Sequence, residues 1–195
     1  AKVVAAGACY DGDPWDLVIT PRWIKKALPI YSVLTLSATG SEMDPFAVIS
    51  DMSKNEKWGT SSEHMKPKMS ILDPEYTYSV SKKQTAAGTA DMISHICENY
   101  FTNVKNADVQ ARFAEGLLKN CFKYGPIALE EPDNYDARAN LMWTASMAIN
   151  GILSDGAEVS WCVHPMEHEL SAFYDITHGE GLAILTPHWM DFALN

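Results

Sequence analysis

The chain has 195 residues, 47% of them hydrophobic and 21% charged, a composition typical of a globular protein with a sizeable core. Its formal net charge of −10 argues against a nucleic-acid partner, and no apolar run approaches the roughly 20 residues of a membrane-spanning helix. The four scattered cysteines form no Cys-x-x-Cys pair, and no signal peptide is visible, so we expect a cytoplasmic protein with reduced thiols.

The first part of the chain mixes short helices with strands. The opening "AKVVAAG" is typical of the last turns of a helix and the closing "PHWMDFALN" of a helix still running, so we expect an internal piece of a longer protein. Apolar runs predict strands over residues 28–37 and 46–50 and one more just before Asp73-Pro74. The polar stretch 51–70 predicts a hairpin or surface loops.

From about residue 80 onward the pattern becomes helical, and five helices are expected with no further strand. The residues expected to mark helix ends are Ser81 with Gln84 for the first helix, Asp108 and Gly125-Pro126 for the second, and Asp133 or Asn134 for the third. The segments "WCVHPMEHELSAF" and "GEGLAILTPHWMDFAL" supply the last two. The sequence therefore predicts a β-containing piece followed by an all-helical domain, with a boundary near residues 74–81.

Five residues of the helical part carry side chains suited to metal binding. Asp91 and His95 are four positions apart on one predicted helix, which places both side chains on the same face. His164 and His168 repeat that spacing, and His178 follows in the Gly-bounded turn "THGEG". Pro165 would kink a helix interior, so we expect His164 within the first turn or at a bend.

Two readings of this set stay open from the residues alone. An Asp and a His one turn apart more often share a surface hydrogen bond than bind a metal, and histidines beside tryptophans are usually packed core residues. One carboxylate with several imidazoles nevertheless suits Fe(II) or Zn(II), and is too rich in nitrogen for magnesium or calcium. Five candidates for four positions would leave one histidine for proton transfer.

Other catalytic motifs are missing from the chain, which has no G-x-S-x-G elbow, Walker loop or H-E-x-x-H segment. An all-helical His/Asp metallohydrolase acting on phosphoesters remains an alternative, although it would call for an adjacent His-Asp pair and basic residues. A non-catalytic fragment is the other alternative.

Three segments, "SVLTLSATGSEMDPFAVIS", "GTADMISHICENYF" and "VHPMEHELSAFYDITHGEGLAILTPHWM", resemble the iron-containing (group III) alcohol dehydrogenases, most closely the butanol dehydrogenase branch. The resemblance implies a Rossmann-like α/β domain that binds NAD or NADP, followed by an all-α metal-binding domain, as in the dehydroquinate synthase-like fold. Residues 1–78 would be the end of the first domain and residues 79–195 most of the second. A dehydroquinate-synthase-like lyase would favour a glutamate-led ligand set, whereas here an aspartate leads.

The resemblance also implies roles for individual residues. The metal ligands would be Asp91, His95, His164 and His178, and His168 would lie near the nicotinamide and relay the alcohol proton. The residues implied at the cofactor are Thr35, Leu36, Asp44, Phe46 and Lys57. The family's Gly-rich phosphate loop would precede Ala1. The implied activity is hydride transfer between a primary, butanol-like alcohol and NAD(P), with Fe(II) or Zn(II), in a homodimer of the full-length enzyme.

Overall fold

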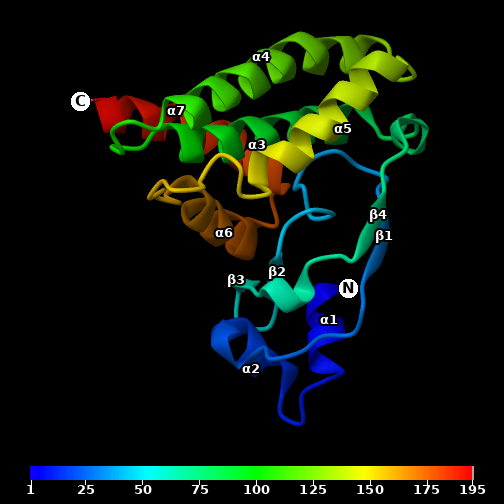
Figure 1. Cartoon of the computed structure of the whole chain (residues 1–195), viewed down its shortest axis with the longest axis vertical. Coiled ribbons are helices and arrows are strands. Elements are labelled where there is room, and N and C mark those ends of the chain that lie inside the picture. The colour runs from blue at the N-terminus through cyan, green and yellow to red at the C-terminus, as the bar shows by residue number, and fades with distance from the viewer. Residues whose placement is uncertain (195) are drawn as a thin grey trace.

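The computed structural model describes residues 1–194 as two regions of different character (Figure 1). The first contains the short helices and all the strands of the described chain: α1 (Lys2–Gly7), α2 (Pro14–Ile19), β1 (Tyr31–Val33), β2 (Phe46–Asp51), β3 (Glu56–Ser61) and β4 (Met69–Ile71), with 3-10 turns at Pro21–Trp23, Glu63–Met65 and Pro74–Thr77. The second contains α3 (Lys82–Tyr100), α4 (Asp108–Glu130), α5 (Tyr135–Ile149), α6 (Val163–Tyr174) and α7 (His178–Leu194). The predicted fold class, an α/β segment followed by an all-helical one, is confirmed.

The four strands form two separate pairs. Strands β2 and β3 form an antiparallel hairpin from Phe46 opposite Ser61 to Asp51 opposite Glu56, so the strand expected over residues 46–50 pairs with the first part of the stretch 51–70, for which a hairpin or loops were expected. Strands β1 and β4 pair in parallel, Tyr31 opposite Met69. The strand expected over residues 28–37 is therefore much shorter than predicted, because only Tyr31–Val33 finds a neighbouring strand to bond with.

Two of the predicted helix starts are confirmed. The Ser81 side chain accepts a hydrogen bond from the backbone N–H of Gln84 (3.2 Å), and Asn134 accepts one from Ala137 (3.0 Å). Each bond satisfies one of the N–H groups that have no partner inside the helix.

Two predictions about α4 are wrong. Asp108 is the first helical residue and not the cap, which is Ala107 and makes no side-chain bond. Pro126 does not end the helix, which continues to Glu130 with the proline inside it. Tertiary packing compensates for the backbone bond that proline removes, because the last turn buries Ala128 in the core.

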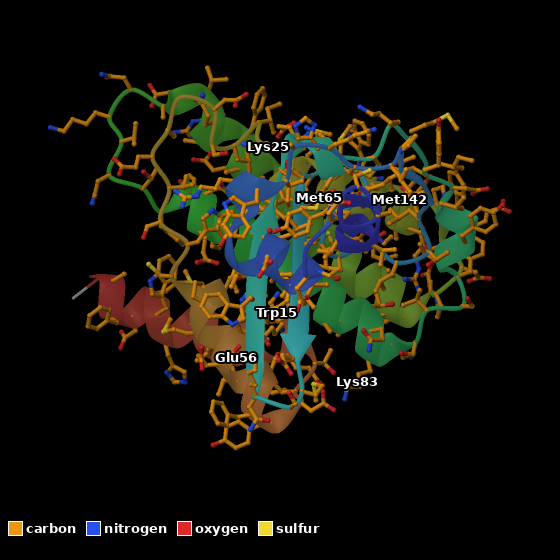
Figure 2. The ribbon with its side chains drawn as sticks, turned by 90° about the horizontal axis from the view of Figure 1, so that it is seen from below. Trp15, Lys25, Glu56, Met65, Lys83 and Met142 are labelled. Atoms are coloured by element: carbon orange, nitrogen blue, oxygen red, sulfur yellow. The ribbon has the colours of Figure 1, made fainter. Side chains whose placement is uncertain are left out.

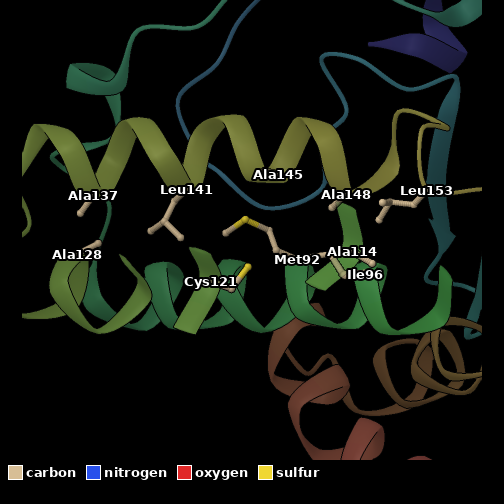
Figure 3. Close-up of a cluster of buried hydrophobic side chains, with 10 residues drawn as sticks. All are labelled: Met92, Ile96, Ala114, Cys121, Ala128, Ala137, Leu141, Ala145, Ala148 and Leu153. Atoms are coloured by element: carbon tan, nitrogen blue, oxygen red, sulfur yellow. The ribbon is translucent and has the colours of Figure 1, made fainter. Parts of the chain in front are cut away.

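The largest core cluster lies between α5 and the pair α3 and α4 (Figure 3). Its buried members are Met92, Ile96, Ala114, Cys121, Ala128, Ala137, Leu141, Ala145, Ala148 and Leu153. Small alanines on α4 and α5 let the helices approach closely, and the long side chains of Met92 and Leu141 fill the space between them (Figure 3). This packing fixes α3, the helix that carries Asp91 and His95.

The β2–β3 hairpin lies between α2 and α6, and Figure 2 shows it from below with Glu56 labelled toward its tip. Side chains alternate along a strand, so the hairpin has two different faces. On one side Thr60 is buried and its hydroxyl donates to the backbone oxygen of Leu17 in α2 (2.8 Å). The other face carries Lys57 and looks toward the helical region. Within residues 1–194, none of the helices combines the length and the hydropathy of a membrane span.

Candidate metal centre

Three helices bring the four predicted ligands together. Asp91 and His95 lie one turn apart in α3, and both side chains are buried, with residue exposures of 2% and 4%. His164 is the second residue of α6, so Pro165 falls in the first turn, where the N–H it lacks would have no helical partner. His178 is the first residue of α7.

One nitrogen of each of three histidines lies close to the same carboxylate oxygen. The Nε2 atoms of His95, His164 and His178 lie 3.7, 3.7 and 3.6 Å from Oδ1 of Asp91. These distances exceed the roughly 2.7–3.2 Å of a hydrogen bond. They are close to the separation of about 3.3–3.6 Å between neighbouring ligands around a tetrahedral ion with bonds of about 2.0–2.2 Å. Ligand atoms of Asp91, His95 and His164 also lie within 4.8 Å of one another, whereas His178 joins this group through Asp91 and is itself grouped with Glu167 and His168.

Buried polar atoms without partners test this fit independently. Within the described chain, Oδ1 of Asp91 and Nε2 of His164 are buried and accept or donate no hydrogen bond. Leaving such groups unpaired costs about 1–3 kcal/mol each, so native proteins rarely tolerate it. A divalent cation held by one carboxylate oxygen and three imidazole nitrogens would satisfy both atoms at once, and the residues therefore fit a transition-metal ion such as Fe(II) or Zn(II).

Burial and the neighbouring carboxylates shift the pKa values of the cluster. Burial lowers the pKa of His95 to about 4, so this imidazole is neutral at pH 7 and keeps a lone pair for a metal. Burial also acts against charge on His164, but the carboxylates of Asp91 and Glu98 facing its ring raise its pKa to about 9. Burial opposes ionisation of Asp91 as well, yet the surrounding histidines lower the pKa of this carboxyl overall.

Two buried glutamates form hydrogen bonds with two of the candidate histidine ligands, and the sequence analysis missed both. Glu98 accepts a hydrogen bond from Nδ1 of His164, and Glu167 accepts one from Nδ1 of His178. A partner on Nδ1 fixes the ring orientation and leaves Nε2 free for an ion. Glu98 bonds a histidine 66 residues later and Glu167 one 11 residues later, so local helical spacing gave no signal for either contact.

A cavity of about 590 Å³ opens beside the ligands. On the α/β side its lining includes three cross-strand pairs of one hairpin face, Phe46–Ser61, Val48–Gly59 and Ser50–Lys57. Ala47 and Thr60, a pair of the other face, also line it. His95, His164 and His178 lie on the opposite side, with Trp161. The volume is within the usual range of about 300–1,000 Å³ for a small-molecule site.

The structure brings some of the predicted cofactor and catalytic residues to this cavity and not others. Phe46, Lys57 and His168 line it, and Asp44 reaches it from the turn before β2. The lining does not include Thr35 and Leu36, which are exposed on the extended segment after β1. Burial, followed by the charges of Lys57 and His178, lowers the pKa of His168 to about 4.

Asp44 is engaged in a buried ion pair. Lys2 of α1 lies 2.6 Å from its Oδ1 and also donates to the backbone oxygens of Asp44 and Phe46, each at 2.8 Å. Burial raises the pKa of Asp44 to about 6, although Lys2 acts in the opposite direction. Asp44 therefore ties α1 to the start of the hairpin.

Comparison with known proteins matches nearly the whole chain. The model described as "Fe-containing alcohol dehydrogenase family, C-terminal" matches residues 85–195, and the model "Iron-containing alcohol dehydrogenase" matches residues 1–74. NADH-dependent butanol dehydrogenase A of Clostridium acetobutylicum is 62% identical over all of this chain and 50% of its own length. NADPH-dependent aldehyde reductase YqhD of Escherichia coli is 43% identical over 95% of this chain and 49% of its own.

Solved structures agree with these matches. The crystal structure of NADH-dependent butanol dehydrogenase A from Thermotoga maritima superposes with a TM-score of 0.95 at 48% identity, covering 98% of this chain and 48% of that one. A sulfoacetaldehyde reductase from Bifidobacterium kashiwanohense in complex with NAD+ superposes with a TM-score of 0.82 at 28% identity. The chain spans about half the length of the curated relatives it matches.

Proposed function

The chain belongs to the iron-containing alcohol dehydrogenase family, and on that premise we propose that the whole protein is an NAD(P)-dependent alcohol dehydrogenase and aldehyde reductase. Its substrate is a primary, butanol-like alcohol or the matching aldehyde, with Fe(II) as the expected metal and Zn(II) as the other candidate. The observation that carries the proposal is the convergence of three histidine nitrogens on Oδ1 of Asp91 at 3.6–3.7 Å.

We propose that residues 1–78 close a nucleotide-binding domain and that residues 79–195 belong to the metal-binding domain. The distribution of elements supports this division, since every strand of the described chain lies before residue 72 and α3 begins at Lys82. A homodimer remains part of the proposal. So does a cytoplasmic location, which the four free cysteines support.

Asp91, His95, His164 and His178 would hold the metal. When bound, the ion supplies Lewis acidity toward the oxygen of the alcohol or aldehyde. The contribution of the chain is preorganisation: Glu98 and Glu167 hold two of the imidazoles by their Nδ1 atoms before any ligand arrives. Asp91 would offset part of the ion's positive charge at a site where Asp91, His95 and His164 are buried.

The hairpin face would be one wall of the nicotinamide site. The nicotinamide supplies or accepts the hydride. Phe46 and Val48 present apolar surface to the cavity, and Trp161 and Ile149 line it from the helical region, so alkyl and ring atoms can be held with little water. We assign Thr35, Leu36, Asp44 and Lys57 to the cofactor side as well, because they match positions of the family's motifs.

His168 is the proposed proton relay. Its ring centroid is 5.8 Å from that of His178, and it lines the cavity. With a pKa of about 4, the imidazole is neutral at pH 7. A neutral imidazole carries a donor on one nitrogen and an acceptor on the other, so His168 can take a proton from the substrate side while releasing another toward solvent.

Metal analysis of the full-length protein tests the site assignment. We expect about one divalent ion per chain, a strong loss of metal in Asp91→Ala and His178→Ala, and no loss in the control His188→Ala, whose side chain is exposed on α7. His168→Ala should keep its metal and lose about 10²–10⁴-fold in butanal reduction by NADH or NADPH. Undiminished metal in both ligand variants would refute the assignment.

A further inference from the structure

The two glutamates behind the metal ligands are held in different ways. Glu98 receives the backbone N–H groups of Cys162 and Val163 on Oε1, at 2.5 and 2.7 Å, so the helical region alone supports it. Glu167 has no such backbone support among the described residues. Its Oε1 accepts the Ser171 hydroxyl, and its Oε2 accepts Nδ1 of His178.

Lys57 places a positive charge next to the buried carboxylate of Glu167. Its Nζ lies 3.1 Å from Oε2 of Glu167 and 3.3 Å from Nδ1 of His178. The pair is largely shielded from solvent, with side-chain exposures of 13% for Lys57 and 0% for Glu167. A fully buried carboxylate without a compensating cation is strongly unfavourable. The ion pair with Glu167 therefore holds the Lys57 ammonium group in place.

The lysine comes from the other region of the chain. Lys57 is on β3, on the hairpin face that looks into the cavity, and its partner is 110 residues later on α6. It is paired across the hairpin with Ser50, and α6 packs directly against β3. A residue of the cofactor-side hairpin therefore contacts the group that orients a metal ligand.

We propose that Lys57 is a positioning residue for the metal ligand His178, acting through Glu167, so that docking of the hairpin strengthens metal binding. The inference rests on the proposed function for the assignment of Asp91, His95, His164 and His178 as ligands. The ion pair with the ammonium group fixes the position of Oε2 of Glu167. Oε2 in turn holds the ring of His178 with its Nε2 directed toward Asp91. Linkage makes the effect reciprocal: a bound ion stabilises the docked hairpin.

A direct contact with the nucleotide, the role given to Lys57 in the proposed function, does not by itself affect metal binding. The two roles predict different measurements. A nucleotide contact changes the affinity for NADH or NADPH and leaves metal affinity unaltered. A positioning residue changes metal affinity when no nucleotide is present, and this effect requires Glu167.

The experiment measures the Zn(II) dissociation constant of the full-length protein by competition with a chelator, without nucleotide. In Lys57→Met we expect an increase of about 10–100-fold, the usual effect of losing a group behind a metal ligand. Lys57→Arg, which keeps the charge and the reach, should remain within a few-fold of wild type. Lys54→Met is the matched control, because Lys54 is on the same hairpin with its side chain 56% exposed.

Glu167→Gln completes a double-mutant cycle. If Lys57 acts through Glu167, the double variant should bind Zn(II) about as weakly as Glu167→Gln alone, and the two effects should not add. The visible spectrum of the Co(II)-loaded protein should also change in Lys57→Met, because it reports the geometry of the ligands. Lys57→Gln is prepared in parallel, and the melting temperature of each metal-free variant checks that it folds.

Unchanged Zn(II) affinity in the folded neutral variants, with weaker nucleotide binding, would overturn the proposal and leave Lys57 as a cofactor contact. Fully additive effects of Lys57→Met and Glu167→Gln would also overturn it. Failure of the proposed function looks different: wild-type protein would then bind Zn(II) no better than Asp91→Ala does.

Discussion

Glu98 and His164 are 66 residues apart in the chain, yet a carboxylate oxygen of Glu98 accepts the hydrogen bond of Nδ1 of His164. The other oxygen receives two backbone N–H groups at the start of α6. Glu98 therefore caps a helix and orients the ring of His164, a proposed metal ligand, at the same time. Both tasks need acceptors only, and a carboxylate provides them on both of its oxygens.

Replacement of Glu98 by glutamine should weaken metal binding by about 10–100-fold. A glutamine has one acceptor oxygen, so either the helix start or His164 loses its partner, at a cost of about 1–3 kcal/mol. Zn(II) competition with a chelator measures the first effect, and urea unfolding of the metal-free protein measures the second. Glu130→Gln, an exposed position at the end of α4, is the control and should alter neither quantity.

A Gly179→Ala substitution should displace His178. A Cβ at this position would lie 2.0 Å from the backbone oxygen of Ala87, so α7 or α3 must shift. We expect a loss of about 1–3 kcal/mol in stability, together with weaker metal binding, measured by thermal unfolding and metal content. Because the clash is with backbone atoms, adding Ala87→Gly should not rescue it. Full metal content in the single variant would contradict the prediction.

Gly59→Val should obstruct the cavity without harming the fold. A Cβ on Gly59 meets no atom within 4 Å, and this residue lines the cavity wall on β3. Valine also suits a strand better than glycine does. We expect the KM for NADH or NADPH to rise at least about tenfold, equivalent to about 1.4 kcal/mol, while the melting temperature does not fall.

The matched control for this prediction is Gly116→Ala on α4, where a Cβ also meets open space. It should leave KM unchanged and stabilise the helix by roughly 0.5–1 kcal/mol. An unaltered KM in Gly59→Val would show that the hairpin face does not border the nucleotide.

Lys2→Met should extend to higher pH the range in which stability depends on Asp44. The folded pKa of Asp44 is raised by burial from 3.8 to about 6, so the folded state binds more protons than the unfolded state between these values. The contribution of Asp44 to stability is thus greatest below pH 4 and falls as pH rises through 6. Removing Lys2 raises the folded pKa further and extends the loss to higher pH.

We therefore expect Lys2→Met to lose roughly 3–5 kcal/mol at pH 8 and to regain part of that loss near pH 5. Urea unfolding of the full-length protein at both pH values measures the difference from wild type. In the double variant Lys2→Met/Asp44→Asn this difference should no longer change with pH. A loss that is equal at pH 5 and pH 8 would rule out ionisation of Asp44 as its cause.

Local chemistry explains what the sequence predicted well. The Ser81 cap, the Asn134 cap and the pairing of Asp91 with His95 on one face depend on residues within four positions of each other, and each is present as predicted. The place of His164 in the first turn of α6 follows from the backbone rules of its neighbour Pro165. Local rules failed at Pro126, where packing of the last turn of α4 outweighed the intrinsic preference of proline.

By itself the sequence determined the order of elements, the residue types of the proposed nitrogen-rich metal centre and the helical positions of its candidate ligands, because these depend on periodicity and near neighbours. Only the tertiary structure decided which groups support that centre. Lys57, Glu98 and Glu167 meet their histidines through the packing of α3, α6 and β3. Contacts over 66 and 110 residues depend on how whole elements fit together, and no local pattern encodes that fit.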